Sequence, residues 1–494
     1  MWPFKKKIVR PPPEKTTWNL SDTVLQLSDH DRWTIGDACQ GCQIWGATGS
    51  GKSSGSFAWI IRSYLKLGFG GIFFTVKPSD TEQYLGYCRE MGREKDVILF
   101  GPDHDQTFNF IDSELQRTDR GAGHVENLVA LFTTVLEISE RNQGGGGREE
   151  EGYWKRTNRQ LLRNLLELLV QARGKVTVWD LYQMALSAPM SPDEVKSKAW
   201  QETSFCYKCM LEADAKCTPK RKQDLLLATN FFLVEWPQLS EKTRSIVLST
   251  LTSMLDVLSR GEVNRLLSPE VTTVRPEMAC DGKIILIDMP LKLFGEVGLM
   301  VQIIWKYCFQ LAMERRDIAA NPRPTFVAID ESHLLVTSED QVFQTTARSS
   351  RTAVVYATQS ISNYMAVFNG ERGESEVHSL LGNLQTSFFH QQSNTETNNY
   401  ASELIGRTKQ CFMNSNTSWG PVNWMDVVLG GSNDTGSSSG MSESYEYEIQ
   451  PSVFNTLAQG GPPDWLVEAI VVQGGKRFHE TGRPWLPVSI RQKF

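Results

Sequence analysis

Short apolar runs recur along the chain and are typical of strands that are buried on both faces of a parallel sheet. The first is Gln43-Ile44-Trp45, and others follow at residues 71–76, 97–100, 283–288, 325–330, 352–358, 386–389 and 467–472. Residues 57–61, separated from the first run by residues 46–56, have apolar positions at helical spacing instead. The pattern predicts an α/β fold, in which a mostly parallel sheet is flanked by helices.

The strand pattern stops between residues 115 and 280, where apolar residues recur at helical spacing. One predicted helical face holds Leu162, Leu165, Leu166 and Leu169, and a second holds Val247, Leu251, Met254, Leu255 and Leu258. We therefore predict that residues 115–280 form an all-α domain. It is inserted into an α/β domain made of residues 32–114 and 281–494.

Three segments lack a regular pattern. Residues 1–31 include three consecutive prolines, Pro11 to Pro13, and are predicted to be an N-terminal arm or linker. Residues 412–447 are rich in Ser, Asn and Gly and are predicted to be a flexible loop of the α/β domain. Within the helical domain, Gly144 to Gly147 predict a second flexible loop.

The bulk composition excludes several classes of protein. The net charge of −6 argues against a histone-like binder with a global basic field, although a locally basic channel stays compatible with it. Nine irregularly spaced cysteines indicate a reducing compartment. No apolar run is long enough to span a bilayer, and the lysine-rich start at residues 1–7 lacks the apolar core of a signal peptide. We expect a cytoplasmic protein, or one peripheral at the cytoplasmic face of the membrane.

One glycine-rich segment has the G-x-x-x-x-G-K-[ST] spacing of a phosphate-binding loop. Its glycines let successive backbone N–H groups turn around an anion, and the next helix begins with its positive end toward the same phosphates. Strand, loop and helix occur in the required order. We predict that this segment binds ATP with Mg²⁺, and that it consists of Gly46, Ala47, Thr48, Gly49, Ser50, Gly51, Lys52, Ser53 and Ser54.

Within this loop, Lys52 is predicted to reach the β- and γ-phosphates, and the Ser53 hydroxyl to ligate Mg²⁺. An ATPase also needs acidic residues at the end of a buried strand, and Asp330-Glu331 follow the run 325–329. We predict that Asp330 holds the Mg²⁺ hydration shell and that Glu331 activates the attacking water. Asp288 also ends an apolar run, but it lacks an adjacent carboxylate and is the weaker alternative.

Further candidates lie around the next predicted strand, residues 352–358. Gln359 ends it and is placed to sense the γ-phosphate, with a solvent-facing strand end as the alternative. Arg348 and Arg351 precede it, and one of them is expected to stabilise the transferred phosphoryl group of a neighbouring subunit if the protein forms a ring. His333 is expected to pack beside the acidic pair rather than to act in the reaction.

The cysteines form two short-range groups. Cys39 and Cys42 precede the first predicted strand, and Cys206, Cys209 and Cys217 lie close together in the helical domain. Structural zinc takes four ligands, and no histidine or fourth cysteine is near the second group. We expect buried or partly exposed thiols, with zinc as the alternative.

With these motifs placed, the chain from about residue 33 onward resembles the TraG/TraD-type coupling proteins of conjugation and type IV secretion, within the HerA–FtsK group of DNA-pumping ATPases. Beyond the phosphate-binding loop, the resemblance rests on the order and spacing of five segments. They are residues 108–112, Tyr153-Trp154-Lys155 leading into Leu161-Leu162, residues 241–246, Ile329-Asp330-Glu331 with Arg348 and Gln359, and residues 398–406.

The resemblance implies a RecA-like domain that assembles into a homo-hexameric ring, with the all-α domain facing the cytoplasm and the substrate. It also implies that Arg348 is the arginine acting across the interface and that Gln359 is the nucleotide sensor. The sequence departs from the family in two ways. No transmembrane helix is visible, so a separate membrane or secretion-channel partner is expected, or a soluble subtype. Thr75-Val76-Lys77 replaces the usual Asp-Pro-Lys, so Lys77 and Asp80 receive no role.

The leading hypothesis is an ATP-driven hexameric translocase that moves DNA, without sequence preference, or a protein–DNA complex. Two alternatives stay open at this point. One is a receptor or adaptor whose nucleotide state gates docking of protein cargo on the helical domain. The other is a HerA-like ATPase that works with a separate nuclease. Two experiments discriminate between the translocase and the receptor or adaptor. One asks whether DNA stimulates ATP hydrolysis, and the other asks whether residues 115–280 alone capture partner proteins.

Overall fold

The computed structural model describes residues 17–118, 122–141, 148–368, 373–418 and 436–492. Its centre is a nine-stranded sheet with the order β13-β12-β9-β3-β8-β7-β4-β6-β5. From β9 to β5 neighbouring strands run parallel, whereas β12 pairs antiparallel with both β9 and β13. The strands are β3 (Cys42–Trp45), β4 (Gly70–Phe74), β5 (Val97–Phe100), β6 (Ile284–Ile287), β7 (Thr325–Asp330), β8 (Thr352–Thr358), β9 (Thr386–Phe389), β12 (Leu466–Gln473) and β13 (Trp485–Arg491). The predicted α/β class is confirmed.

Strands β3, β4, β6, β7, β8 and β9 are buried along their whole length because both faces of the sheet are covered there. In β7, Phe326 and Ala328 pack into one core with helices α2 (Ala58–Lys66) and α3 (Asp80–Glu90). Val327 and Ile329 point the other way, into a second core that includes α15 (Leu291–Arg315). This alternation follows from the two-residue period of a strand.

The remaining helices of the α/β part surround the sheet or cap its edges. They are α1 (Ile35–Ala38), the one-turn η1 (Ser53–Phe57), η2 (Glu94–Asp96), α4 (Phe110–Leu115), η4 (Pro276–Asp281), η5 (Ser332–Leu334), α16 (Ser338–Ala347), α17 (Ile361–Val367), α18 (Gly373–Asn383), α19 (Thr395–Ile405) and η6 (Pro451–Thr456). No helix among the described residues is long and apolar enough to cross a membrane.

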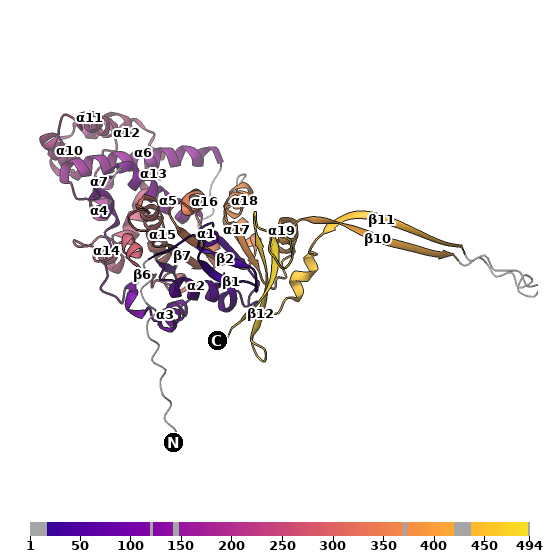
Figure 1. Ribbon diagram of the computed structural model, residues 1–494. Helices are drawn as coiled ribbons and strands as arrows, with labels where there is room; N and C mark the ends of the chain where they lie inside the picture. The colour runs from indigo at the N-terminus through magenta and orange to yellow at the C-terminus, as the bar shows by residue number, and fades with distance from the viewer. Residues whose placement is uncertain (1–16, 119–121, 142–147, 369–372, 419–435, 493–494) are drawn as a thin grey trace, which may run out of the picture.

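Between β5 and β6 the described residues contain helices only, and these stand above the sheet at one end of the molecule (Figure 1). Past α4 they are α5 (Val125–Arg141), α6 (Arg148–Arg173), α7 (Val178–Leu186), α8 (Pro192–Lys196), α9 (Lys198–Thr203), α10 (Phe205–Lys216), α11 (Lys222–Asn230), η3 (Phe231–Glu235), α12 (Trp236–Gln238), α13 (Glu241–Leu258) and α14 (Gly261–Leu267). The apolar faces predicted within 161–170 and 246–258 are buried on α6 and α13. That the helices between residues 115 and 280 form a separate domain stays a prediction.

The structure corrects two expectations for the irregular segments. Residues 17–31 are no arm: Trp18, Val24 and Leu25 are buried, and β1 (Thr23–Gln26) pairs with β2 (Arg32–Thr34). The expected loop at 412–447 is largely a β-hairpin of β10 (Arg407–Ser418) and β11 (Gly436–Tyr447). Residues 1–16, 419–435 and the predicted loop 144–147 lie outside the described residues.

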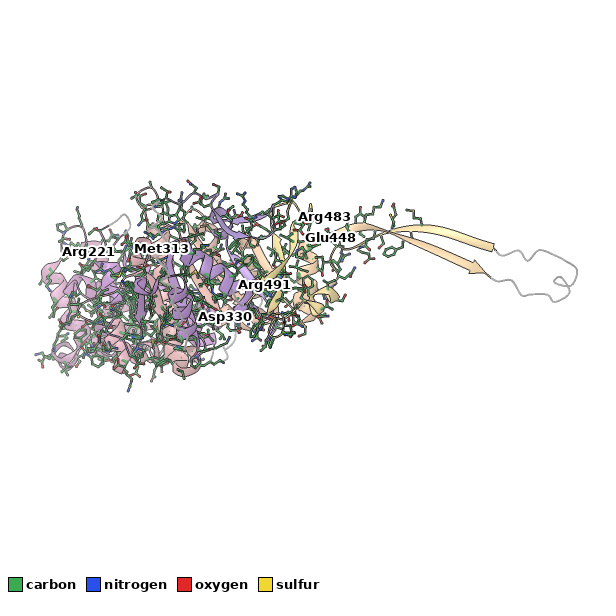
Figure 2. The ribbon with its side chains drawn as sticks, turned by 60° about the horizontal axis from the view of Figure 1, so that its bottom comes forward. Arg221, Met313, Asp330, Glu448, Arg483 and Arg491 are labelled. Carbon is green, nitrogen blue, oxygen red and sulfur yellow. The ribbon has the colours of Figure 1, made fainter. Side chains whose placement is uncertain are left out.

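The hairpin projects away from the sheet as a two-stranded ribbon (Figure 1). Side chains of the two strands contact each other: the Lys409 ammonium lies 2.5 Å from the Glu443 carboxylate, and the Arg407 guanidinium lies 4.5 Å from the ring centre of Tyr447. At its root, Arg483 and Glu448 form an ion pair of 2.9 Å (Figure 2). Pairing across the ribbon therefore fixes a segment whose composition alone favours a loop.

A buried ionic network joins α15, α16 and β8 behind the sheet. The Asp340 carboxylate accepts hydrogen bonds from Lys306, from Gln310 at 2.8 Å, from the Tyr356 hydroxyl at 2.6 Å and from the Thr337 amide at 2.6 Å. Burial alone would raise the pKa of Asp340, but the Lys306 ammonium outweighs it and the pKa is lowered. This network fixes α16, which connects the acidic motif to Arg348.

We predict that Lys306→Met lowers the free energy of unfolding by about 3–5 kcal/mol, because it leaves the Asp340 carboxylate buried without its cation. Thermal unfolding monitored by circular dichroism measures the effect. The exposed Lys66→Met is the matched control and should leave the melting temperature nearly unchanged. Equal melting temperatures for the two variants would show that the network contributes no stability.

Candidate nucleotide-binding site

The functional candidates gather where parallel strands end. Strands β3, β8, β7 and β4 are adjacent and point the same way, so the residues that follow them meet at one edge of the sheet. The phosphate-binding loop follows β3, Gln359 follows β8, Asp330-Glu331 end β7, and Lys77 follows β4. Such an edge is where open α/β sheets bind ligands.

The loop at residues 46–52 adopts a shape that depends on glycine. Gly49 and Gly51 have φ angles of 81° and 84°, in the region that other residues seldom adopt. A Cβ atom at Gly51 would lie 2.6 Å from the Val467 side chain, and one at Gly46 would lie 2.3 Å from the Ser50 hydroxyl. Helix η1 starts directly after Lys52, so its positive end faces the loop.

Two pairs of side chains connect the loop to β7. The Lys52 ammonium lies 3.1 Å from Glu331 Oε1, and the Ser53 hydroxyl donates to Asp330 Oδ2 at 2.7 Å. Lys52, Asp330 and Glu331 are buried. The structure therefore brings together the predicted phosphate-binding lysine, both predicted Mg²⁺-holding residues and the predicted water-activating carboxylate.

Glu331 combines a rare backbone conformation with a lowered side-chain pKa. It adopts the left-handed conformation with φ 57° and ψ 46°, which is rare for a residue with a side chain. Burial would raise the pKa of its carboxyl, but Lys52, with help from Lys77, lowers the pKa below its usual value. Its second oxygen, Oε2, is buried and has no hydrogen-bond partner among the described residues. A charged carboxylate with one open acceptor is suited to orient a water molecule.

Lys77 is the site residue that sequence reasoning left without a role. Its ammonium lies 3.5 Å from Asp330 Oδ2 and 3.6 Å from Glu331 Oε1. Asp80 fixes the Lys77 backbone, because its carboxylate accepts hydrogen bonds from the amides of Val76 and Lys77 at 2.8 and 2.7 Å. The sequence offered one indication of a role for Lys77: it follows a strand that ends at the same edge of the sheet as the phosphate-binding loop.

The structure separates the two candidate arginines. Arg351 donates to the carbonyl oxygens of Trp18 and Pro322, both at 3.1 Å, so its guanidinium is engaged within the chain. Arg348 is exposed at the end of α16, at the start of the seven-residue β8. It thus lies roughly 20 Å, the length of β8, from the edge that carries its own phosphate-binding loop. At that distance it does not contact the site of its own chain.

Gln359 lines the cavity at the loop, whereas His333 supports the strand ends. The ring of His333 lies 2.9 Å from the Thr358 hydroxyl and 3.4 Å from Asn363. Burial lowers the pKa of His333.

Asp288, the alternative acidic candidate, lies two strands away from β7 and is hydrogen-bonded to Thr81 and His104.

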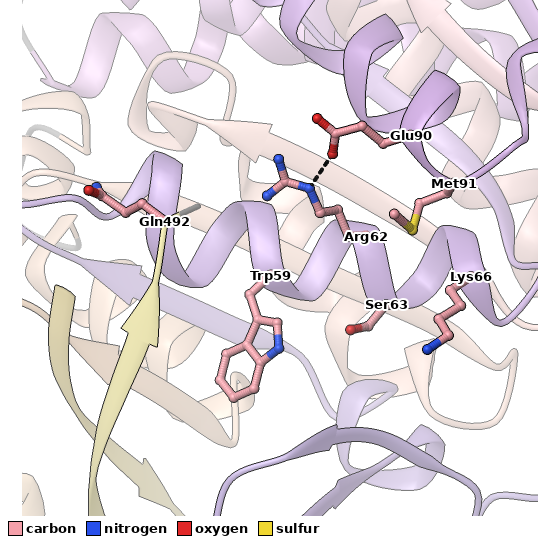
Figure 3. Close-up of a pocket in the computed structure, with 7 residues that line it drawn as sticks. All are labelled: Trp59, Arg62, Ser63, Lys66, Glu90, Met91 and Gln492. Atoms are coloured by element: carbon pink, nitrogen blue, oxygen red, sulfur yellow. Dashed lines mark hydrogen bonds and ion pairs between the residues drawn. The ribbon is translucent and has the colours of Figure 1, made fainter. Parts of the chain in front are cut away.

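The cavity at the loop measures about 690 Å³, which is large enough for a nucleotide. Residues from the C-terminal segment form one of its walls and were missed by sequence reasoning; they are Gln459, Gly460, Gly461, Trp465 and Gln492. A larger cavity of about 770 Å³ lies along α2 and shares Gln492 (Figure 3). There the Arg62 guanidinium is already paired with Glu90 at 2.7 Å. That cavity lacks the phosphate-binding loop.

Within the described residues, the cysteines are not grouped with other potential metal ligands. Cys39, Cys42, Cys206 and Cys209 are buried, and burial raises the pKa of Cys39 to about 12 and of Cys209 to about 11. Within the part of the chain that the structure describes, no group of three or more His, Cys, Asp or Glu side chains could hold a metal ion. Inert, protonated thiols explain these positions.

Known proteins resemble this chain in sequence over one segment and in fold over most of its length. Residues 324–450 match the family model described as the TraM recognition site of TraD and TraG. The unbound form of the bacterial conjugative coupling protein TrwB has the same fold, with a TM-score of 0.61 and 15% identity over 95% of this chain and 90% of that chain. The resemblance to TraG/TraD-type coupling proteins is confirmed. Among curated proteins, none is similar in sequence to this chain.

Two further TrwB structures contain nucleotides. The complex with the GTP analogue GDPNP has a TM-score of 0.59 and 16% identity over 94% of this chain and 88% of that chain. The complex with ADP and Mg²⁺ has a TM-score of 0.53 and 15% identity over 94% and 87%. At this level of identity, the likeness to TrwB establishes the coupling-protein fold.

We predict that Glu331→Gln lowers the melting temperature of the nucleotide-free protein near pH 7, because Lys52 loses the partner that offsets its burial. The lowered pKa of Glu331 means that the ion pair contributes above about pH 4.5 and is lost as the pH falls through that lowered pKa. The difference between parent and variant should therefore shrink toward pH 3. Melting curves from pH 3 to 7 test this, and a difference independent of pH would contradict it.

Proposed function

We propose that this protein is a coupling ATPase of the conjugative or type IV secretion type, which hydrolyses ATP to move DNA or a protein–DNA complex. The proposal is carried by one observation: Lys52 and Ser53 lie within hydrogen-bond distance of Glu331 and Asp330. The structural likeness to TrwB, which has been captured with the ATP analogue ADPNP and with ADP and Mg²⁺, supports ATP and Mg²⁺ as the ligands.

The residues at the loop fit this ligand. The Ser53 hydroxyl and the Asp330 carboxylate place two oxygen atoms side by side, and oxygen is the ligand type that Mg²⁺ takes. Mg²⁺ neutralises charge on the β- and γ-phosphates when bound. Lys52 releases Glu331 and binds the terminal phosphates, which frees the carboxylate to accept a proton from the attacking water. Gln359 contacts that water or the γ-phosphate from the neighbouring strand end.

The exposed Arg348 requires a second subunit to complete the site. We propose a homo-hexameric ring, in which Arg348 of one subunit reaches the nucleotide of the next. In this arrangement hydrolysis changes the orientation of neighbouring subunits, and basic loops lining the pore hold the DNA backbone without reading its sequence. In this proposal a secretion-channel or membrane partner holds the ring at the cytoplasmic face of the membrane.

Steady-state ATP hydrolysis with and without DNA tests the proposal. We expect both single- and double-stranded DNA to stimulate turnover at low salt, and the stimulation to fall at high salt because phosphate contacts are ionic. Glu331→Gln should keep ATP binding while nearly abolishing hydrolysis. Turnover that DNA never stimulates would favour the cargo-receptor alternative, and parent-like turnover by Glu331→Gln would remove the role given to that carboxylate.

Mixing experiments test the ring. Arg348→Ala should lose about 10³- to 10⁵-fold in hydrolysis rate, as for other arginines that stabilise the transferred phosphoryl group. A Lys52→Ala subunit is inactive but still carries Arg348, and an Arg348→Ala subunit still has an intact phosphate-binding loop. Mixing the two variants should therefore restore activity at sites that combine the intact loop of one with the Arg348 of the other. Arg351→Ala is the matched control: it lowers stability, and mixing does not restore it. No recovery with Arg348→Ala would contradict a shared site.

A further inference from the structure

The C-terminal segment closes the nucleotide cavity on the side away from Glu331. In the sheet, the strand of the phosphate-binding loop, β3, has β8 and β7 on one side and β9, β12 and β13 on the other. The terminal phosphate belongs on the β7 side, where Asp330, Glu331 and Lys77 lie. The nucleoside end of the ligand therefore extends toward β12 and β13.

The wall on that side is built onto the loop itself. The Gln492 side chain donates to the Ser54 hydroxyl at 2.7 Å and accepts from the Gly461 amide at 2.7 Å. Gly51 is packed so closely that a Cβ atom would lie 2.7 Å from the Gln459 carbonyl oxygen. Residues 459–461 and 492 thus have a fixed position relative to the phosphates.

Trp465 occupies this wall in a conformation that a bulky residue rarely takes. Its φ angle is 52°, yet both of its backbone groups are paired: its amide donates to the Gly461 carbonyl at 2.8 Å, and its carbonyl accepts from the Gln492 amide at 2.9 Å. The side chain is half-buried and lines the cavity. Backbone strain held by surrounding structure occurs at ligand sites, and glycine would relieve it here at the cost of the indole.

We propose that Trp465 is a stacking platform for the nucleobase. This inference rests on the proposed function and identifies the purine subsite of the same cavity. An indole ring is flat and apolar, and bases stack on such rings with little regard to their identity. The site therefore takes ATP and GTP alike, whereas inorganic triphosphate, which has no base, does not use it.

Isothermal titration with Mg²⁺ compares the binding of ATP, GTP and inorganic triphosphate to the full chain. Trp465→Ala should weaken ATP and GTP by roughly 5- to 150-fold, the range seen when stacked bases lose their aromatic partner. Binding of triphosphate should stay the same, which also shows that the variant is folded. Trp465→Phe should restore most of the ATP affinity. Trp179→Ala, which removes an exposed tryptophan of α7, is the matched control and should change nothing.

Each contrary result has its own meaning. Equal weakening of ATP and triphosphate would show that Trp465 only supports the phosphate-binding loop, and unchanged ATP binding would show that the base lies elsewhere. Either result overturns the stacking platform and leaves the ATPase proposal intact. A parent protein that binds neither ATP nor triphosphate would contradict the ATPase proposal itself, and the nucleobase site with it.

Discussion

The contact between Lys52 and Glu331 joins two parts of the chain that are 279 residues apart in sequence. Both side chains are buried, and each would be costly there without the other. The pair exists because β3 and β7 end at the same edge of the sheet, with β8 between them. Residues 459–461, 465 and 492 of the C-terminal segment line the cavity at this edge.

The same pair explains how the site can respond to a nucleotide. Lys52 and Lys77 together neutralise Asp330 and Glu331 in the absence of phosphate. In the proposed function, a triphosphate competes with the carboxylates for these cations, so that its binding releases Glu331. Asp340 and its buried partners hold α16, which ends next to Arg348, in place.

The sequence predicted those elements in which the buried side chains form an apolar run or an apolar helical face within one short segment. Strands β5, β8 and β9 begin and end where their apolar runs do, and the α6 and α13 faces are buried as expected. Strand β13 was missed although Leu486, Val488 and Ile490 alternate with exposed residues, because Pro487 interrupts the run on an edge strand. The β10–β11 ribbon carried no such signal, since its stability comes from pairing across two polar strands.

For the site, the spacing of residues 46–53 and the pair Asp330-Glu331 were sufficient to predict which segments come together. Lys77, Trp465 and Gln492 could not be predicted, because their relation to the loop depends on strand order and on one positive φ angle. The resemblance already favoured Arg348, and the structure adds that the Arg351 guanidinium is bonded to the carbonyl oxygens of Trp18 and Pro322. Tertiary contacts of this kind leave no local pattern in a sequence.

A structure of the protein with Mg²⁺ and a non-hydrolysable ATP analogue is the decisive test of whether Lys52 exchanges Glu331 for phosphate. We expect Lys52 to leave Glu331 for the terminal phosphates, and the Ser53 hydroxyl and Asp330 to lie beside the metal ion. Glu331 should then face a water molecule in line with the γ-phosphate. An analogue bound elsewhere, or a Lys52–Glu331 pair that stays intact beside bound nucleotide, would contradict this exchange.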